Sequence, residues 1–571
     1  MTKTTTTPPR LGRPRALAAA IVAAAGLLAA SPGTQAATGP SAPDAAVIVR
    51  APGAGAAAAA QAVTRVGGTV TFELSIVDGV AAKVPAASVA RLQAQGLDVT
   101  ADDKVTVTAN TDSDNTSTIK PVTLEELGAD RLHKQGIDGN ETRTVALIDT
   151  GVTTAGIPDL AGRIVPITEP GNGPTGTSTV KSCLDLSGEL SCDDTYGHGT
   201  FLAALIAGSG SASKGAYKGV APGTRIVSVK IAGRDGSSDV SKVLAGIQWV
   251  VQSKDQYGIR VLNLSLGTNS RQDYRVDPLN LAVERSWDAG ITTVVSAGNL
   301  GPKYDTVTKP GDDPVVITVG ASEDRETPAV DDDRIPLFSG RGSATIAKPD
   351  VVAPGTRVIS VLAPGSTIEQ SLVAKGSPAV TGYYRRASGT SMSAALVSGT
   401  AALLADSHPE WTPGQVKTAM LATARKTSLA DPLAVGKGLV DVYAANSVRN
   451  PGDANAGVVR SDGSGFLHLS RGSVIVRALC DDLRSKVDRQ CGQEITGENA
   501  ANGEEYDKEE FAGTSWYGTS WYNSQWNGTS WYGTSWYMYE PSQGTAWDGN
   551  SESTTSHGLP IGGSATYGLW R

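Results

Sequence analysis

The chain has 571 residues, and a single hydrophobic core rarely keeps growing to that length, so more than one folding unit is expected. Its apolar content of 40% and charged content of 19% are ordinary for a globular protein. The net charge of -8 and the isoelectric point near 5.3 give no basic surface for nucleic acid. Nucleic-acid partners are therefore disfavoured.

The N-terminus has the layout of a secretory signal peptide, residues 1–36. Positive charges come first, without acidic side chains, at Lys3, Arg10, Arg13 and Arg15. An apolar run at 16–30 follows, and 34–36 then match the spacing of a cleavage site. A membrane anchor is disfavoured because the run is shorter than the roughly 20 residues that span a bilayer. The sequence predicts a secreted, extracellular protein with no transmembrane anchor.

Residues 44–107 predict a small α+β unit with a ferredoxin-like order of elements. The patterns read strand, helix, strand, strand, helix, strand, at 46–50, 56–65, 69–75, 79–83, 87–95 and 98–106. The polar stretch 110–120 has no hydrophobic period and is typical of an exposed linker. The unit is either a removable segment or a small domain that stays attached.

Between 121 and 446, short β-branched runs alternate with longer helical patterns. Strands are expected at 144–149, 225–231, 261–266, 291–296 and 315–319, and helices at 200–207, 240–254, 278–289, 391–405 and 413–424. Because the strands are apolar throughout, the pattern predicts an α/β domain with a mostly parallel sheet covered on both faces. Ligand sites in such sheets collect at the carboxyl ends of the strands.

After 446 the composition changes, and seven of the ten tryptophans lie in the region 447–571. Five units of five residues follow from Gly513, with aromatic side chains at Trp516, Trp521, Trp526, Trp531 and Trp536. A period of five suits neither a continuous strand nor a helix. Each unit is therefore expected to contain its own turn, and stacked turns would form a small solenoid-like layer.

Four residues supply what serine-based cleavage of an amide needs: a base, a carboxylate that fixes its tautomer, and donors for the oxyanion. Asp149 ends an apolar strand, and His198 begins a helix in Gly-His-Gly-Thr. Ser391 stands at a helix start, where the helix itself offers no acceptor for the backbone N–H. We therefore expect the N–H of Ser391 to be a first oxyanion donor. Asn299 ends another strand and offers its amide as a second donor. Each of these residues taken alone is also typical of a turn or a helix cap. Together, in the order Asp, His, Asn, Ser along the chain, they predict a nucleophilic serine site.

The region from about 124 to 445 resembles the catalytic domain of the subtilisin family, the subtilases of peptidase family S8. The matching segments are Asp-Thr-Gly at 149–151, Gly-His-Gly-Thr at 197–200, Ala-Gly-Asn at 297–299 and Gly-Thr-Ser-Met at 389–392. The resemblance implies the three-layer subtilisin fold. It also implies a hydrolase, a serine endopeptidase (EC 3.4.21.-) that acts on proteins or peptides.

The resemblance further implies the roles of single residues and regions. The triad is Asp149, His198 and Ser391, with Asn299 in the oxyanion hole. The substrate strand is lined by Ser265, Leu266 and Gly267, and the far wall of the primary pocket contains Thr308. The α+β unit resembles the subtilisin prodomain, which in that family assists folding and blocks the active site until it is cut away. We therefore expect a zymogen with a signal peptide 1–36, an inhibitor-type prodomain 37–108, a processing linker 109–120, a peptidase domain 121–446 and a C-terminal region 447–571.

The four cysteines form two close pairs, Cys183 with Cys192 and Cys480 with Cys491. In an exported chain this spacing predicts two local disulfides, because a zinc site needs closer spacing or matching histidines. No cofactor is expected for the chemistry. Calcium is common in the family, and the acidic runs 193–194 and 331–333 are candidate contributors, although a solvated acidic run is the simpler interpretation.

Other classes of protein fit less well. An aspartic protease needs a second Asp-Thr-Gly or Asp-Ser-Gly, which the sequence does not contain. An α/β-hydrolase needs Gly-x-Ser-x-Gly, but Ser393 stands at the last position. A different alternative is a protein in which the Trp-rich tail is the working part and contacts a cell surface or polymer. The competing interpretation of the tail is that its rings mainly bury one another.

Overall fold

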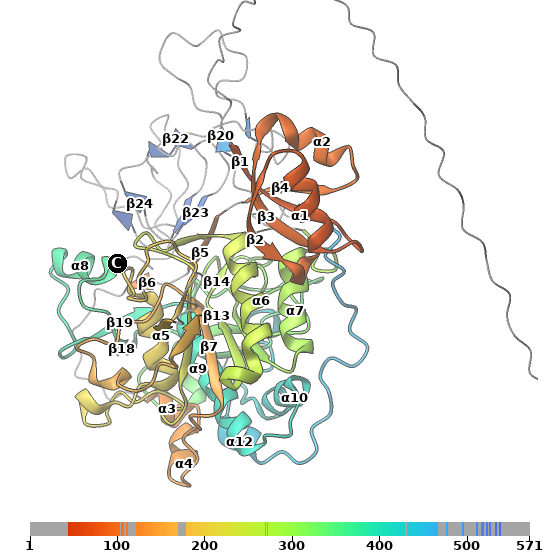
Figure 1. Cartoon of the computed structure of the whole chain (residues 1–571). Coiled ribbons are helices and arrows are strands. Elements are labelled where there is room, and N and C mark those ends of the chain that lie inside the picture. Colours follow the sequence, from red (N-terminus) through yellow and green to blue (C-terminus); the bar gives the residue numbers. More distant parts are fainter. Residues whose placement is uncertain are drawn as a thin grey trace, which may run out of the picture. The chain divides into compact units, whose positions relative to one another are not determined.

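The computed structural model describes residues 44–102, 104–107, 110–111, 122–169, 179–268, 270, 272–428 and 431–465, and short strands between 476 and 537 (Figure 1). The expected signal peptide 1–36 and most of the linker 109–120 lie outside the described residues, as do Cys480 and Cys491. Within these ranges, no helix is long and apolar enough to cross a membrane.

Seven strands form the central sheet, and every neighbouring pair in it is parallel. In spatial order they are β10 (Leu184–Asp185), β11 (Ile226–Lys230), β7 (Thr144–Asp149), β13 (Ile259–Leu264), β15 (Thr292–Ser296), β16 (Ile317–Ser322) and β17 (Val351–Pro354). Every residue of β7 is buried, as in a strand covered on both faces. The strand order changes direction at β7, so its carboxyl end is the place where an open α/β sheet forms a ligand site. The predicted parallel sheet is confirmed.

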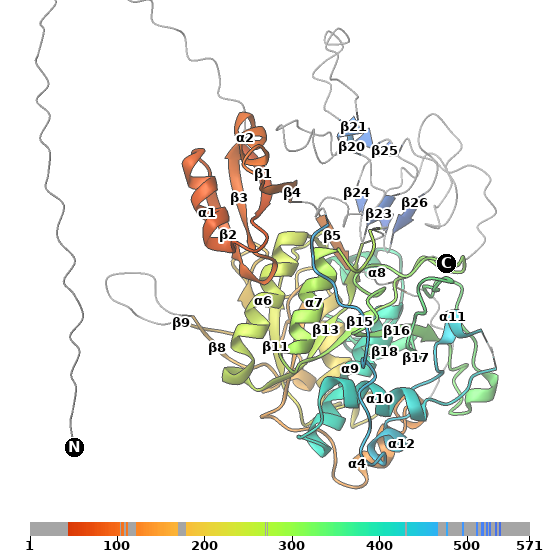
Figure 2. The same cartoon turned by 90° about the vertical axis from the view of Figure 1, so that its right-hand side faces the viewer.

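Helices cover both faces of this sheet (Figure 1). The pair α6 (Val240–Tyr257) and α7 (Pro278–Asp288) packs on one face, and α5 (His198–Ala207) and α9 (Thr390–Ser407) pack on the other. All but the last two residues of α9 are buried, which explains its lack of a polar face. It is covered in turn by α10 (Pro413–Thr423) and α12 (Val442–Asn446) (Figure 2).

Smaller elements complete the described part of this region. They are α3 (Thr123–Glu126), α4 (Ala129–His133), α8 (Thr367–Ala374), α11 (Pro432–Val435), the pair β8 (Ile167–Glu169) and β9 (Thr179–Lys181), and β18 (Val358–Val361), which pairs with β19 (Tyr384–Ser388). The chain continues to pack on the α/β region after Asn446, because the N–H of Ser461 donates to both carboxylate oxygens of Glu284 at 3.0 Å.

The N-terminal unit has the predicted order of elements (Figure 2). They are β1 (Asp44–Arg50), α1 (Ala56–Arg65), β2 (Thr69–Leu74), β3 (Gly79–Pro85), α2 (Val89–Gln93) and β4 (Asp98–Ala101). The strands form an antiparallel sheet in the order β2-β3-β1-β4. Valines and alanines on one face of the sheet and on the two helices form a separate hydrophobic core. On its other side, the side chain of Gln248 in α6 bonds to the backbone of Glu73 and Ile76.

The strand expected at 98–106 is divided in two. β4 ends at Ala101, and the carboxylate of Asp102 accepts hydrogen bonds from Ser241 at the start of α6. β5 (Lys104–Val107) then pairs antiparallel between β12 (Ser237–Asp239) and β14 (Leu266–Gly267). β6 (Asn110–Thr111) pairs with β19. The prediction of one continuous strand was wrong because its second half joins strands of the α/β region.

Short strands in the tail pair in parallel with residues fifteen positions further on, which is three five-residue units. The pairs are β22 (Glu510–Phe511) with β25 (Gln525–Trp526), β23 (Trp516–Gly518) with β26 (Trp531–Gly533), and β24 (Trp521–Tyr522) with β27 (Trp536–Tyr537). Equivalent residues of units that are three apart are therefore in register.

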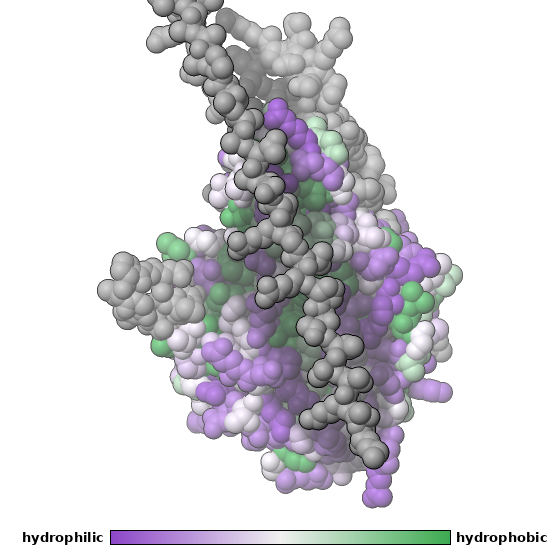
Figure 3. All heavy atoms as spheres, turned by 45° about the vertical axis from the view of Figure 1, so that its right-hand side comes forward, coloured by the Kyte–Doolittle hydropathy of each residue, from purple (hydrophilic) through white to green (hydrophobic). Residues whose placement is uncertain are grey.

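The face of the molecule in Figure 3 is mostly hydrophilic, with small separate hydrophobic areas between the charged and polar residues. The exposed large apolar side chains of the described part come from separate segments, namely Val180, Leu190, Tyr304, Leu337, Val373, Tyr383 and Val459. Single exposed apolar residues of this kind are usual on a globular surface.

Candidate active site

The carboxylate of Asp149 and the imidazole of His198 face each other at the carboxyl end of β7. Nδ1 of His198 lies 2.8 Å from Oδ1 and 3.0 Å from Oδ2 of Asp149, and both residues are only 1% exposed. The N–H of Thr150 donates to the same Oδ1 at 2.8 Å. A carboxylate beside Nδ1 favours the tautomer with the proton on that atom, which leaves Nε2 free to accept a proton.

Two glycines allow His198 to approach Asp149. Gly197 has a φ of 113°, a conformation that favours glycine, and α5 begins directly after it. A side-chain carbon at Gly199 would collide with the carbonyl oxygen of Gly151. The Gly-His-Gly motif therefore has a physical reason, because the helix start lies directly against the segment that follows Asp149.

Ser391 is the second residue of α9 and follows Gly389, whose φ is 153°. Its Oγ donates to the carbonyl oxygen of Ser265 at 3.4 Å. In return, Oγ of Ser265 donates to the carbonyl oxygen of Ser391 at 3.1 Å and accepts from the amide of Asn263 at 3.0 Å. The start of α9 is thus fixed to the segment between β13 and β14.

His198 lies close to the start of α9, because it shares a cavity with a residue of that helix. Nε2 is buried and has no hydrogen-bond partner among the described residues. His198 lines a small cavity together with Gly197, Phe201 and Met392, the residue after Ser391.

The side chain of Asn299 is oriented by Thr390, the residue before Ser391. Its Oδ1 accepts from the N–H of Thr390 at 2.9 Å and from the hydroxyl at 3.0 Å. Because a backbone N–H can only donate, the atom facing it is an oxygen, and Nδ2 lies on the other side. Nδ2 is buried and has no partner among the described residues. An N–H group held in this way can donate to a negative charge that develops beside Ser391.

The residues expected to bind substrate also come together. Leu266 and Gly267 form β14, which directly follows Ser265. A side-chain carbon at Gly267 or at Gly298 would lie only 2.6 Å from Oγ1 of Thr308. Thr308 therefore contacts both the expected substrate strand and the segment before Asn299.

Two residues that shape this site were not predicted to have these roles. Thr390 orients Asn299, and the buried carboxylate of Asp194 accepts hydrogen bonds from both sides of the Asp149–His198 pair. Asp194 lies in an acidic pair that resembles a solvated turn, and only the fold shows what surrounds it.

Cys183 and Cys192 form the predicted disulfide. In the described part of the chain, no group of three or more His, Cys, Asp or Glu side chains is arranged to hold a metal ion. Asp194, a candidate contributor to calcium binding, directs its carboxylate at N–H and O–H donors of the chain.

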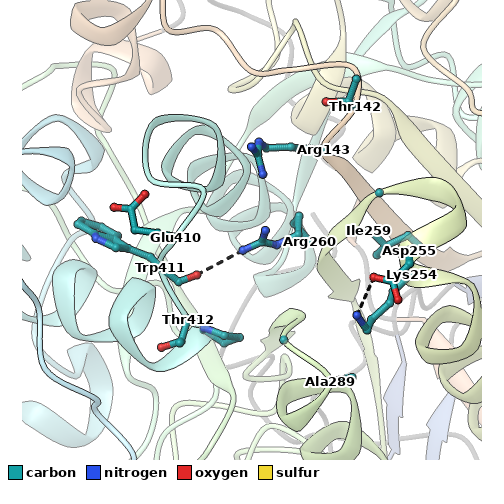
Figure 4. A pocket seen from close by; sticks show the side chains of 13 residues that line it. Thr142, Arg143, Lys254, Asp255, Ile259, Arg260, Ala289, Glu410, Trp411 and Thr412 are labelled. Carbon is teal, nitrogen blue, oxygen red and sulfur yellow. Dashed lines mark hydrogen bonds and ion pairs between the residues drawn. The ribbon is translucent and has the colours of Figure 1, made fainter.

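A second cleft, of about 440 Å³, lies at the amino ends of the strands and is therefore separate from Asp149 (Figure 4). It is lined by Thr142 and Arg143 before β7, by the start of β13, and by the turn before α10. Figure 4 shows the guanidinium of Arg260 directed at the carbonyl oxygen of Trp411, which it meets at 3.3 Å.

A parallel sheet with an aspartate at a central strand end, and with a histidine and a serine at two helix starts, defines an α/β serine hydrolase. The model of the subtilase family (Peptidase_S8) matches residues 140–465, more than half of the chain. The chain belongs to this family, whose members are serine peptidases.

Individual relatives agree with this assignment. The serine protease AprX of Bacillus subtilis is 36% identical over 312 residues, which are 53% of this chain and 66% of AprX. Subtilisin DY of Bacillus licheniformis is 30% identical over 327 residues, 57% of this chain and 98% of that protein. The crystal structure of fervidolysin from Fervidobacterium pennivorans, a keratinolytic enzyme related to subtilisin, matches with a TM-score of 0.54 at 22% identity. It covers 72% of this chain and 62% of fervidolysin, and the likeness shows the fold alone.

Proposed function

We propose that the chain is a secreted serine endopeptidase made as a self-processing zymogen. In the proposed reaction, Oγ of Ser391 attacks the carbonyl carbon of a peptide bond while Nε2 of His198 takes its proton. The same imidazole then gives the proton to the leaving amine, and water releases the acyl group by the reverse route. Asp149 holds the imidazole throughout, and apart from substrate and water these steps use groups of this chain.

The observation that carries this proposal is the orientation of groups around Ser391. Among the residues that the structure describes, neither Nε2 of His198, beside Asp149, nor Nδ2 of Asn299 has a hydrogen-bond partner, and both atoms are buried. The first suits a base, and the second suits a donor to the oxyanion, together with the N–H of Ser391.

Labelling with a fluorophosphonate tests the enzyme directly. We expect one label on Ser391 of the mature protein and none on Ser391→Ala, while Ser393→Ala, two residues further along the same helix, keeps the label. Mature protein that folds but takes no label would contradict the proposed activity.

Self-processing is supported by the strands on either side of Ser391. Val107 of β5 pairs with Leu266, and Thr106 pairs with Gly267, so β5 lies along the strand that is expected to bind substrate. Beyond it, β6 pairs Asn110 with Ser388, shortly before the nucleophile. The chain's own residues 104–107 and 110–111 thus lie where the two sides of a substrate would bind, with the N-terminal unit as an intramolecular inhibitor.

The bond cut during maturation lies, on this proposal, between Val107 and Asn110. We propose Thr108–Ala109, the middle one of the three bonds, which is also the boundary expected from the sequence. Mass spectrometry of the mature protein should find Ala109 at its N-terminus, and Ser391→Ala should keep the N-terminal unit in a protease-free host. A mature N-terminus other than Ala109 would contradict cleavage of this bond, and a mature N-terminus outside 108–110, or normal processing of Ser391→Ala, would contradict self-processing between the two strands.

Export is proposed from the signal-like residues 1–36. The uncut Ser391→Ala precursor provides the test, because its N-terminus reports signal removal alone. We expect secreted precursor that starts near residue 37, whereas retention inside the cell with Met1 or Thr2 first would contradict export.

A second candidate role concerns the tail 513–571. The parallel pairing of units fifteen residues apart supports a regular repeat, which would suit a module that contacts a cell surface or polymer. Full-length protein and a variant lacking 513–571 should then differ in binding to insoluble cell-wall polymer but not in peptide hydrolysis. Equal binding by both would contradict this role.

A further inference from the structure

A buried carboxylate in the loop before α5 has no role in the mechanism above. We propose that Asp194 is a positioning residue, which holds the start of the His198 helix and the end of the Asp149 strand in one arrangement. This inference rests on the proposed serine peptidase function. It concerns a residue that needs no contact with substrate.

Asp194 is 2% exposed and joins two separate segments of the chain. Its Oδ1 accepts from the hydroxyl of Thr150 at 2.7 Å and from the N–H of Gly197 at 2.6 Å. Its Oδ2 accepts from the N–H of Thr200 at 2.7 Å. Thr150 is the residue after Asp149, while Gly197 and Thr200 lie on either side of His198. One carboxylate therefore bonds to the chain neighbours of both members of the pair.

On the histidine side, Asp194 replaces a missing helix cap. The first N–H groups of a helix need acceptors from outside it, and the N-cap residue Gly197 has no side chain to supply one. Asp194, three residues before Gly197, supplies acceptors for the N–H groups of Gly197 and Thr200. Its negative charge also suits the positive end of the helix dipole. Because His198 is the first residue of α5, fixing this turn also fixes the backbone position from which the imidazole extends.

On the aspartate side, Asp194 determines where the hydroxyl of Thr150 donates its single hydrogen. That hydroxyl lies 2.7 Å from Oδ1 of Asp194 but 3.2 Å from Oδ1 of Asp149, and it accepts from the N–H of Gly199 at 2.9 Å. We infer that the hydroxyl of Thr150 donates its hydrogen in the shorter contact, to Asp194. Without Asp194 the hydroxyl would turn to Asp149 and compete with the imidazole for the carboxylate oxygen.

The loop that carries Asp194 is itself held by contacts remote from the reacting atoms. The N–H of Asp194 donates to Oγ1 of Thr153 at 2.9 Å, and the Cys183–Cys192 disulfide closes the loop just upstream. The buried ammonium of Lys230 bonds to the carbonyl oxygen of Asp193 at 2.5 Å and to Glu189 at 2.8 Å. Burial raises the pKa of the Asp194 carboxyl, and the hydrogen bonds from Thr200, Gly197 and Thr150 oppose that effect.

A purely structural role makes a different prediction from a positioning role. A structural residue affects how much protein folds, whereas a positioning residue affects how fast each folded molecule works. The number of active sites in each preparation is therefore titrated with a fluorophosphonate, and kcat is expressed per titrated site. KM and the melting temperature are measured on the same preparations.

The test compares mature wild-type protein with Asp194→Asn, Thr150→Val and the double variant. Misplacement of a catalytic group by about 1 Å can reduce a rate about a hundredfold, so we expect kcat per site of Asp194→Asn to fall about that much. KM should change less than threefold. Thr150→Val should lower kcat about tenfold, and the loss in the double variant should be smaller than the product of the single losses, because both remove one shared hydrogen bond. Asp193→Asn, at the neighbouring exposed carboxylate, is the matched control and should keep its kcat.

Either of two results would overturn the positioning role. One is a kcat per titrated site within threefold of wild type for Asp194→Asn, even if its melting temperature falls. The other, which remains available if Asp194→Asn does not fold, is an unchanged kcat per site for Thr150→Val. Failure of the wild-type protein itself to take the label would instead contradict the proposed peptidase function.

Discussion

Nδ1 of His198 lies 2.8 Å from Oδ1 of Asp149, and both side chains are almost completely buried. Replacing Asp149 with Asn should keep this shape but present an N–H to Nδ1, which favours the wrong tautomer of the imidazole. In a serine protease triad this change lowers kcat about 10⁴-fold, and we expect a loss of that order. Steady-state kinetics with a peptide substrate measures it. Asp255→Asn, at a side chain that is 90% exposed, is the control and should leave kcat unchanged.

Asn299→Ala tests the oxyanion donor. The buried Nδ2 has no partner among the described residues, so the resting site loses only the two hydrogen bonds that Oδ1 accepts from Thr390. The loss should therefore appear in the transition state, as a fall in kcat of about 10²- to 10³-fold, or about 2.7–4 kcal/mol, a figure that comes from a subtilisin. KM should stay close to the wild-type value. A kcat within threefold of wild type would show that Asn299 does not stabilise the oxyanion.

The elements and the site were predictable from the sequence to different degrees. The strand 144–149 and the helix 278–289 were found to within one residue, because an apolar run and an Asp-Pro helix start are local signals. The four site residues were predicted because each ends or follows a strand or begins a helix, and the structure shows the contact between Asp149 and His198.

Long-range contacts were not predictable in the same way. Asp194 resembles a solvated acidic residue until the fold brings Thr150 and Thr200 to its two oxygens. The division of the strand 98–106 depends on strands more than a hundred residues further along the chain. Local patterns carry no information about such partners.

Glu284 gives a prediction for the pH dependence of stability. Burial, and the nearby carboxylate of Asp313, raise the pKa of Glu284 to about 8. An acid whose folded pKa lies above its unfolded value, about 4.3, stabilises the fold fully below that unfolded value. This contribution is lost as the pH rises towards 8, with a slope of up to about 1.4 kcal/mol per pH unit. We therefore expect the free energy of unfolding to fall between pH 5 and pH 8.

Glu284→Gln removes this titration, so its stability should depend less on pH over the same interval. Chemical denaturation at several pH values, in a Ser391→Ala background that cannot digest itself, measures the difference. Glu141→Gln, at an exposed glutamate, should keep the wild-type dependence. Parallel curves for wild type and Glu284→Gln would show that the carboxyl is not responsible.

Truncations at two positions separate the part of the C-terminal region that belongs to the catalytic fold from the part that does not. Besides the Ser461–Glu284 contact, the amide of Asn455 donates to the carbonyl oxygen of Val315 at 2.9 Å. Deleting 451–571 removes the Asn455 donor from Val315 and leaves the buried carboxylate of Glu284 without the N–H of Ser461, and an unpaired buried group costs about 1–3 kcal/mol, so the melting temperature should fall clearly. Deleting only 513–571 spares both contacts and should leave the melting temperature and kcat/KM unchanged. A large loss of stability in the shorter deletion would instead mean that the tryptophan repeats pack as part of the catalytic core, and would contradict their role as a separate module.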